Sequence, residues 1–314
     1  MYVLRAMKKI LNKRILAVVM CIICMSQAYS QQQVMFTQYM FNGLVLNPAY
    51  AGSHESISMT ALSRVQWVGL DGAPNTQTFS IHSPVPDKNF ALGGFFVRDN
   101  IGVTSENNFF LSYAYRIRTK SGTISMGIQG GMSSVRTSFD DLSVQDANLR
   151  GTSSKMKPNF GAGLYYRTER FYFGASAPYI LRNSDSDQVS SLPQEINTDQ
   201  IQHYYLTSGV VLDISPLVKV KPSLLVKAVS GAPVEFDINA NFLFDEKLWL
   251  GVSYRSFDSI DLLLELQLNS QFRLGYAYDI TVTELAGVNS GSHEIMLNYR
   301  LIFSKSKIVT PRYF

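Results

Sequence analysis

The chain has 314 residues, of which 46% are hydrophobic and 17% are charged, and its formal net charge is +4. Five of its 28 basic residues lie within the first fourteen positions, and without them 23 basic residues face 24 acidic ones. The basic excess therefore belongs to the N-terminus, and the remainder carries a net charge of −1. A chain so balanced lacks the positive surface that binds phosphates, which excludes nucleic-acid binding.

The first thirty residues read as a secretory signal peptide. The basic stretch precedes an apolar run, Ile15–Met25, and Ala28 and Ser30 place small residues before a cut at Gln31. The run is too short for a transmembrane helix. A lipoprotein signal is disfavoured, because neither Cys21 nor Cys24 follows a small residue. Both cysteines leave with the leader, so a large core or a membrane must hold the exported chain in place of disulfides.

Residues 31–53 form a distinct N-terminal stretch, which we expect to be a short helical or irregular segment that lies in the periplasm or plugs a barrel. Apolar residues recur in it at roughly helical spacing, among them Phe36 and Tyr39. It ends in Asn47–Gly52 (NPAYAG). Pro48 disfavours helical geometry at Asn47, and the small residues with Gly52 permit a tight bend. The simplest expectation is a hinge at the periplasmic rim that feeds the first strand.

From residue 54 onward, apolar and polar residues alternate with a period of two, which is typical of strands with one apolar face. In Val234–Phe244, for example, the alternate positions from Val234 are all apolar, whereas those between are mostly charged or amide residues. Fourteen such segments are predicted. They are 54–67, 74–85, 89–99, 104–118, 122–135, 158–168, 170–181, 202–214, 217–230, 234–245, 247–256, 260–269, 271–280 and 292–303.

These strands predict an all-β fold, a transmembrane antiparallel barrel of about 14 strands over residues 54–303, followed by a tail at 304–314. Most exceed the ~5–6 residues of soluble strands and approach the ~9–11 that a tilted strand needs to cross a bilayer. Links after odd-numbered strands include the longest ones, 136–157 and 182–201, whereas links after even-numbered strands are tight turns. Outer-membrane barrels show the same asymmetry, with the longer loops outside the cell. We therefore expect outer-membrane lipid around the chain and the cell outer membrane as its location.

The second face of the later strands carries charges whose sign changes from one strand to the next. Lys221 and Lys227 precede Glu235 and Asp237, and further charges follow on the next three strands. In a barrel this face lines the lumen, where opposite charges pair across the ladder. Ion pairs that fill the lumen are the simpler interpretation, and a charged transport path is the alternative.

No motif predicts catalysis, a cofactor or a metal. None of the four histidines has a partner at metal-ligand spacing. Ser292 and His293 could belong to an enzyme site at the barrel rim, but no nucleophile-elbow motif accompanies them. The glycine pairs at 93–94 and 130–131 lie within strands, where a bulge or close packing explains them better than a phosphate loop. Adjacent aromatic residues at Phe109, Tyr165 and His203–Tyr205 are interpreted as an interfacial girdle.

Two long stretches give the chain a family resemblance. QYMFNGLVLNPAYAG at Gln38–Gly52, followed by RVQWVGLDGAPNTQTFSIHSP at Arg64–Pro84, resembles the PorP/SprF family of Bacteroidetes outer-membrane proteins. Shorter matches such as GSHEIMLNYRL and the final PRYF extend the resemblance over the whole exported chain. One departure is Gly43, where the family would have proline.

The resemblance implies a part in type IX protein secretion and, in some species, in gliding motility. The implied partners are other secretion components or a secreted adhesin cargo domain, with no small-molecule substrate. A passive channel for small solutes or lipids is the alternative. The family implies no catalytic residues. Its motif positions are candidates for structural or partner-binding roles: Asn47, Pro48, Ala49, Tyr50, Gly52, Arg64, Gln66 and Trp67.

Overall fold

The computed structural model describes residues 34–138, 151–182, 200–230 and 232–301. The predicted signal peptide, the centres of the two longest links and the tail at 304–314 lie outside the described residues.

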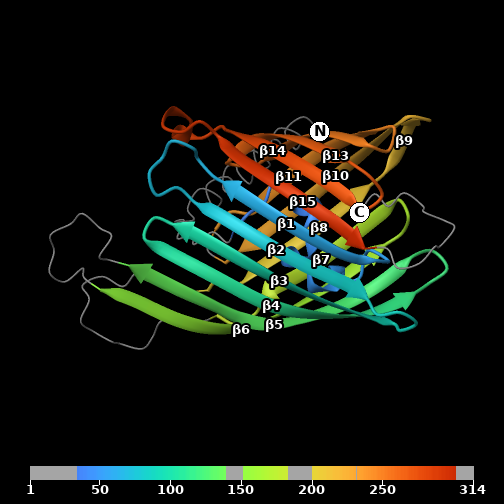
Figure 1. Ribbon diagram of the computed structural model, residues 1–314, viewed down its shortest axis with the longest axis horizontal. Coiled ribbons are helices and arrows are strands. Elements are labelled where there is room, and N and C mark those ends of the chain that lie inside the picture. The colour runs from blue at the N-terminus through green and yellow to red at the C-terminus, as the bar shows by residue number, and fades with distance from the viewer. Residues whose placement is uncertain (1–33, 139–150, 183–199, 231, 302–314) are drawn as a thin grey trace, which may run out of the picture.

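The described strands form one closed antiparallel barrel (Figure 1). Apart from β8 and β9, which both pair with β10, each strand pairs with the next along the chain. β15 pairs with β1, and β10 pairs with β11, so the sheet has no open edge. Since β8 and β9 occupy successive parts of one position beside β10, the wall has fourteen positions among the described residues. The predicted fourteen-stranded barrel is confirmed. The strands are β1 (Ile57–Val65), β2 (Asn75–Pro84), β3 (Phe90–Ile101), β4 (Thr104–Arg118), β5 (Thr123–Ser138), β6 (Thr152–Arg167), β7 (Phe171–Tyr179), β8 (His203–Val210), β9 (Leu212–Ser215), β10 (Val218–Val229), β11 (Glu235–Phe244), β12 (Leu248–Arg255), β13 (Ser259–Gln267), β14 (Phe272–Thr281) and β15 (Ser292–Leu301).

Three strand predictions differ markedly from the structure in their extent. The expected strand 202–214 is interrupted at Val211, whose side chain is 1% exposed and whose amide bonds outside the ladder, to the Arg170 carbonyl. β5 and β6 are longer than predicted and stay in register out to the pair Ser138↔Thr152. The added residues are mainly Ser, Thr, Lys and Arg, so no apolar alternation revealed them, although their backbones pair as well as any others.

The links divide between the two ends of the barrel. At the short-turn end lie 85–89, 119–122, 168–170, 216–217, 245–247 and 268–271, and at the long-link end lie 66–74, 102–103, 139–151, 180–202, 230–234, 256–258 and 282–291. β1 begins and β15 ends at the short-turn end. In Figure 1 the barrel lies on its side, and the arrow of β15 points toward this end.

The outer face of the wall is apolar and the inner face is largely polar. In β13, Ile260, Leu262, Leu264 and Leu266 are 40–50% exposed, whereas Asp261 and Glu265, on the other face, are 0–1% exposed. Such alternation is the pattern of a membrane β-barrel, in which the apolar outer band contacts lipid and not water. The strand predictions therefore also had the correct faces.

The adjacent aromatic residues do not form a single girdle. Phe109 and Tyr204 face outward, but Phe110 and Tyr205, which follow them, are buried inside the barrel, as is Tyr165. Successive side chains of a strand point to opposite faces, so an aromatic pair within a strand must divide between the membrane and the lumen. The girdle interpretation was wrong for these inward members.

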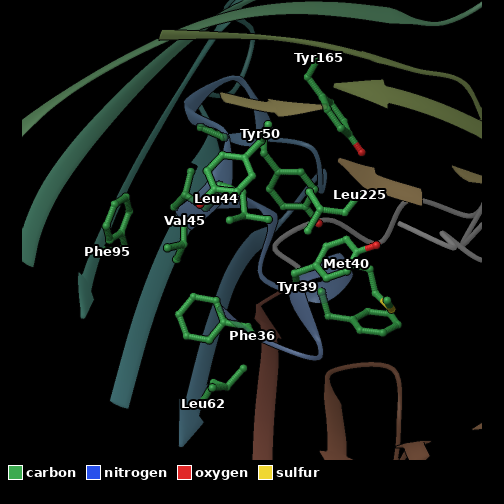
Figure 2. Close-up of a cluster of buried hydrophobic side chains, with 14 of the residues drawn as sticks. Phe36, Tyr39, Met40, Leu44, Val45, Tyr50, Leu62, Phe95, Tyr165 and Leu225 are labelled. Atoms are coloured by element: carbon green, nitrogen blue, oxygen red, sulfur yellow. The ribbon is translucent and has the colours of Figure 1, made fainter. Parts of the chain in front are cut away.

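Residues 34–53, which we call the plug, lie inside the barrel (Figures 1 and 2). The plug contains three short turns: η1 (Tyr39–Phe41), α2 (Gly43–Leu46) and η2 (Pro48–Tyr50). From Phe36 onward its apolar residues are buried and pack against inward-facing Leu62, Phe95, Tyr165 and Leu225, as Figure 2 shows. Among the described residues, no helix has the length and apolar character needed to cross a bilayer.

The plug runs the length of the lumen, antiparallel to β1. Val34 and Met35 lie beside links of the long-link end, whereas the Gly52 carbonyl accepts a hydrogen bond from Arg116 near the short-turn end. The hinge expected at the rim is therefore only its last bend, and Asn47–Tyr50 lie deeper, against the wall. Most of the segment is buried because it fills the lumen of the barrel, and it contains no long amphipathic helix.

Candidate functional site: the plug, its seat and the vestibule

The part of the plug toward the long-link end, around Thr37 and Gln38, is held by a buried charged cluster on β1, β14 and β15. Arg64 lies 2.6 Å from Asp279 and 3.4 Å from Glu294, and it also donates a hydrogen bond to the Thr37 hydroxyl at 2.7 Å. The Glu294 carboxylate accepts hydrogen bonds from the backbone amides of Thr37 and Gln38, at 2.9 and 2.8 Å. The wall thus satisfies plug backbone groups that have no secondary-structure partner, which a buried irregular segment requires.

The middle of the plug meets the opposite wall. The Tyr39 hydroxyl accepts a hydrogen bond from Asn239 of β11 at 2.8 Å. The ammonium group of Lys221 lies 4.5 Å from the ring centre of Phe41 and 5.1 Å from that of Trp249, so the buried lysine is held between two aromatic faces. Contacts of this kind stabilise a desolvated cation more than an exposed one.

The part of the plug toward the short-turn end, Asn47–Tyr50, lies against glycines of β5 and β6. We call this surface of the wall the seat. The side-chain amide of Asn47 donates to the Leu164 carbonyl. The side-chain oxygen of Asn47 accepts from the backbone amide of Ala49, and this bond caps η2. A Cβ atom added at Gly127 would overlap the backbone of Pro48 and Ala49, and one at Gly163 would overlap the Asn47 side chain. The wall therefore lacks side chains where the motif makes its closest approach.

The plug turns into β1 at Gly52, whose φ of +72° is unfavourable for other residues. A Cβ at this position would also overlap the Ala91 side chain. The Gly52 amide donates to His82, and the rings of His54 and His82 stack with their centres 5.1 Å apart. Tyr50 packs edge-on against both histidines and against Tyr165, so its ring contacts β2, β6 and the residue His54 before β1.

The His54 ring, which follows the plug at the short-turn end, has a lowered pKa. Burial lowers the pKa of His54 well below its usual value of 6.5, and the nearby Arg300, whose guanidinium lies 3.1 Å from Nε2, lowers it further. A buried neutral imidazole is favoured for both reasons. The plug is thus joined to β1 through an uncharged histidine at neutral pH.

The structure divides the predicted site residues between two places. Six of them lie in the lumen: Asn47, Pro48, Ala49, Tyr50 and Gly52 at the seat, and Arg64 in the charged cluster. Gln66 and Trp67 lie in the β1–β2 link at the long-link end, where Trp67 has a φ of +47° and its amide donates to the Ser292 hydroxyl. The motif residues are therefore not one site.

Gln66 and Trp67 line a vestibule of about 900 Å³, which is the cavity at the long-link end above Val34 and Met35. Its wall mixes acidic and apolar side chains from several strand ends and links, including Asp99, Glu284 and Phe257. The plug forms its floor.

The residues considered for a rim enzyme do not form a catalytic pair. Ser292 is 2% exposed and faces the lumen, whereas the neighbouring His293 faces the outside and lies 2.7 Å from the Tyr276 hydroxyl. As consecutive residues of a strand they point to opposite faces, so His293 is not positioned to act as a base for Ser292. Among the described residues, no three His, Cys, Asp or Glu side chains are grouped to hold a metal.

Sequence reasoning missed the two wall features that hold the plug. Glu294 carried a signal, since an acidic residue on the inner face of the last strand needs a partner, but the plug amides it binds are 256 and 257 residues away in sequence. Gly127 and Gly163 carried none beyond the general expectation of close packing at strand glycines.

A closed barrel with an apolar belt and a filled lumen defines the class: an outer-membrane β-barrel with an internal plug. The family model for the type IX secretion system membrane protein PorP/SprF matches residues 28–299. The chain belongs to this family, and its location is the outer membrane. The resemblance noted in the sequence is confirmed.

No curated protein matches the chain. Distant similarities to solved structures include Acinetobacter baumannii Omp33, with 7% identity, TM-score 0.48, and 79% of this chain and 98% of that chain covered. A Pseudomonas aeruginosa FadL homologue has 11% identity, TM-score 0.44, and 82% and 93% coverage. A KdgM porin has 10% identity, TM-score 0.40, and 78% and 99% coverage. Similarities this distant carry no inference about function.

Proposed function

We propose that the protein is a non-enzymatic, plugged component of type IX secretion that docks other secretion components or a surface-anchored cargo domain. The plug is the observation that carries this proposal. A lumen crossed from one end to the other by residues 34–53 suits a docking platform better than a conduit, and the plug is tied to the wall near both ends. A role in gliding motility is part of the same proposal, for species that move by surface adhesins.

The plug also argues against the passive channel for solutes or lipids. A porin needs a continuous aqueous path, whereas here the inward side chains of the wall meet a buried apolar segment. We infer that the secretory signal is cleaved before Gln31 and that the exported chain starts close to the plug.

Two measurements test the proposal. In planar bilayers, the purified full-length barrel is expected to give conductance near background, whereas a variant lacking residues 34–46 is expected to give steady channels. Affinity purification from outer membranes, followed by mass spectrometry, is expected to recover type IX components or a large surface protein. Large steady conductance of the intact chain, together with partner-free purifications under gentle solubilisation, would support the channel instead.

A further inference from the structure

The vestibule at the long-link end has an excess of carboxylates. Its lining carries five acidic side chains and two basic ones, Arg64 and Arg255; the acidic residues are Asp99, Glu106, Glu235, Asp258 and Glu284.

The two arginines are already neutralised by the wall below them. Arg64 pairs with Asp279 and Glu294, and Arg255 lies 3.1 Å from Asp237 and 3.4 Å from Asp258. Glu235 lies 3.0 Å from Lys227, so two of the five vestibule carboxylates, Asp258 and Glu235, are already paired. Asp99 accepts a hydrogen bond from the Thr76 hydroxyl, and Glu284 is exposed in the β14–β15 link. In the part of the chain that the structure describes, no basic side chain lies within ion-pair distance of either. The field inside a concave, low-dielectric mouth adds up in sign and attracts cations.

A second observation points to the same chemistry. His203 is 3% exposed and lines the vestibule. Its Nδ1 lies 2.9 Å from the Ile201 carbonyl and donates to it, and burial favours the neutral ring. Nε2 is then an acceptor, and it has no hydrogen-bond partner among the described residues. A buried acceptor of this kind is satisfied by an N–H group.

The vestibule also offers apolar contact. Phe257, in the tight β12–β13 link, has a φ of +64° and is 70% exposed, and Leu285 and Ile101 are also exposed. Large apolar side chains that converge on a cavity mark a contact surface when polar groups surround them.

We propose that the vestibule binds a cationic polypeptide segment, with lysine or arginine side chains directed at the carboxylates and a bulky apolar side chain against Phe257 and Leu285. This inference rests on the proposed docking function and specifies the chemistry of the partner. A cavity of about 900 Å³ admits a few residues of an extended chain. A bound metal ion fits less well, since the described carboxylates do not cluster as ligands.

The test uses the purified full-length barrel in detergent and two fluorescent hexapeptides, one alternating Lys with Phe and one alternating Glu with Phe. Fluorescence anisotropy is expected to show binding of the Lys peptide only, weakening as salt is raised. The variant D258N/E284Q changes two link residues and is expected to weaken that binding at least tenfold. The matched control D87N/D245N removes the same charge at the short-turn end, in turns whose positive φ asparagine tolerates, and is expected to bind as the wild type does.

Equal binding of both peptides, or equal loss in both variants, would overturn the inference. The variant F257A is expected to weaken binding of the Lys peptide, whereas a purely electrostatic surface would bind that peptide as the wild type does. Affinity purification separates the two proposals. If D258N/E284Q recovers the same partners as the wild type, the docking function stands and the vestibule inference fails. If neither protein recovers a partner, the docking function itself fails.

Discussion

At the scale of single residues, the plug is held by a few buried polar groups that each meet several partners. Glu294 binds two consecutive plug amides and lies within 3.4 Å of Arg64, yet it is 0% exposed. A buried carboxylate of this kind is stabilised only while its partners remain in place, because its desolvation is otherwise uncompensated. Removing one partner is therefore expected to cost more than the single contact would suggest.

The substitution E294Q is expected to lower the free energy of unfolding by about 3–5 kcal/mol, the range for breaking a buried ion pair. Glutamine keeps the shape but leaves Arg64 with Asp279 alone and can accept at only one oxygen. Denaturant unfolding in detergent micelles, followed by the loss of compact mobility on unheated gels, measures the change. I295V, on the adjacent lipid-facing position, is the control and is expected to stay within about 1.5 kcal/mol of wild type. A change below 1 kcal/mol in E294Q would show that the cluster does not anchor the plug.

At the scale of elements, the plug and the wall are fitted to one another by size. The plug has only short turns, so its shape depends on the surface that surrounds it, and the glycines of β5 and β6 leave the space that η2 occupies. A short 3₁₀ turn has little stability alone. The seat therefore determines where the motif lies, and the alternation of the strand places Gly127 on the inner face.

The substitution G127V is expected to prevent η2 from seating, because the valine side chain would occupy the space of Pro48 and Ala49. Overpacking of this kind costs about 1–3 kcal/mol, and here it is expected to displace the plug rather than the paired strands. Single-channel recording is the measurement, with conductance expected to rise from background toward that of the variant lacking residues 34–46. I128V, which faces the lipid, is expected to remain closed. If G127V also stays closed with unchanged stability, the seat does not hold the plug.

At the scale of the whole molecule, the orientation in the membrane decides what each end can meet. The longest links gather at one end with the vestibule, and outer-membrane barrels place such links outside the cell. The plug starts at this same end, so the beginning of the described chain lies with the long links and not with the start of β1. Of the two places expected for this segment, the periplasm or the lumen, residues 34–36 lie at the vestibule end of the lumen.

Single cysteines test the orientation, because the only two cysteines of the chain, Cys21 and Cys24, lie in the predicted leader. A membrane-impermeant maleimide added to intact cells is expected to label F257C, at the long-link end, and to leave K120C, in the β4–β5 turn, unlabelled. Both positions are exposed, so disruption of the membrane is expected to make them equally reactive. Labelling of K120C alone in intact cells would reverse the assignment of the two ends.

The sequence by itself determined the barrel, its fourteen positions and the inward or outward direction of most side chains. It did so because alternation along a strand is a local property, which lipid on one side and a polar lumen on the other impose residue by residue. The family motif was equally visible. Strand ends at 138 and 152 were missed because backbone pairing continues where apolar alternation stops.

Only the tertiary structure decided where the motif residues lie and what they contact. Asn47 and Arg64 meet groups more than a hundred residues away, in the bonds from Asn47 to Leu164 and from Arg64 to Glu294. Gln66 and Trp67 are separated from them at the vestibule. The inward face of a strand can be read from its pattern, but which segment occupies the lumen depends on the closed shape of all fourteen positions. The plug, its seat and the acidic vestibule exist only once that closure brings distant strands around residues 34–53.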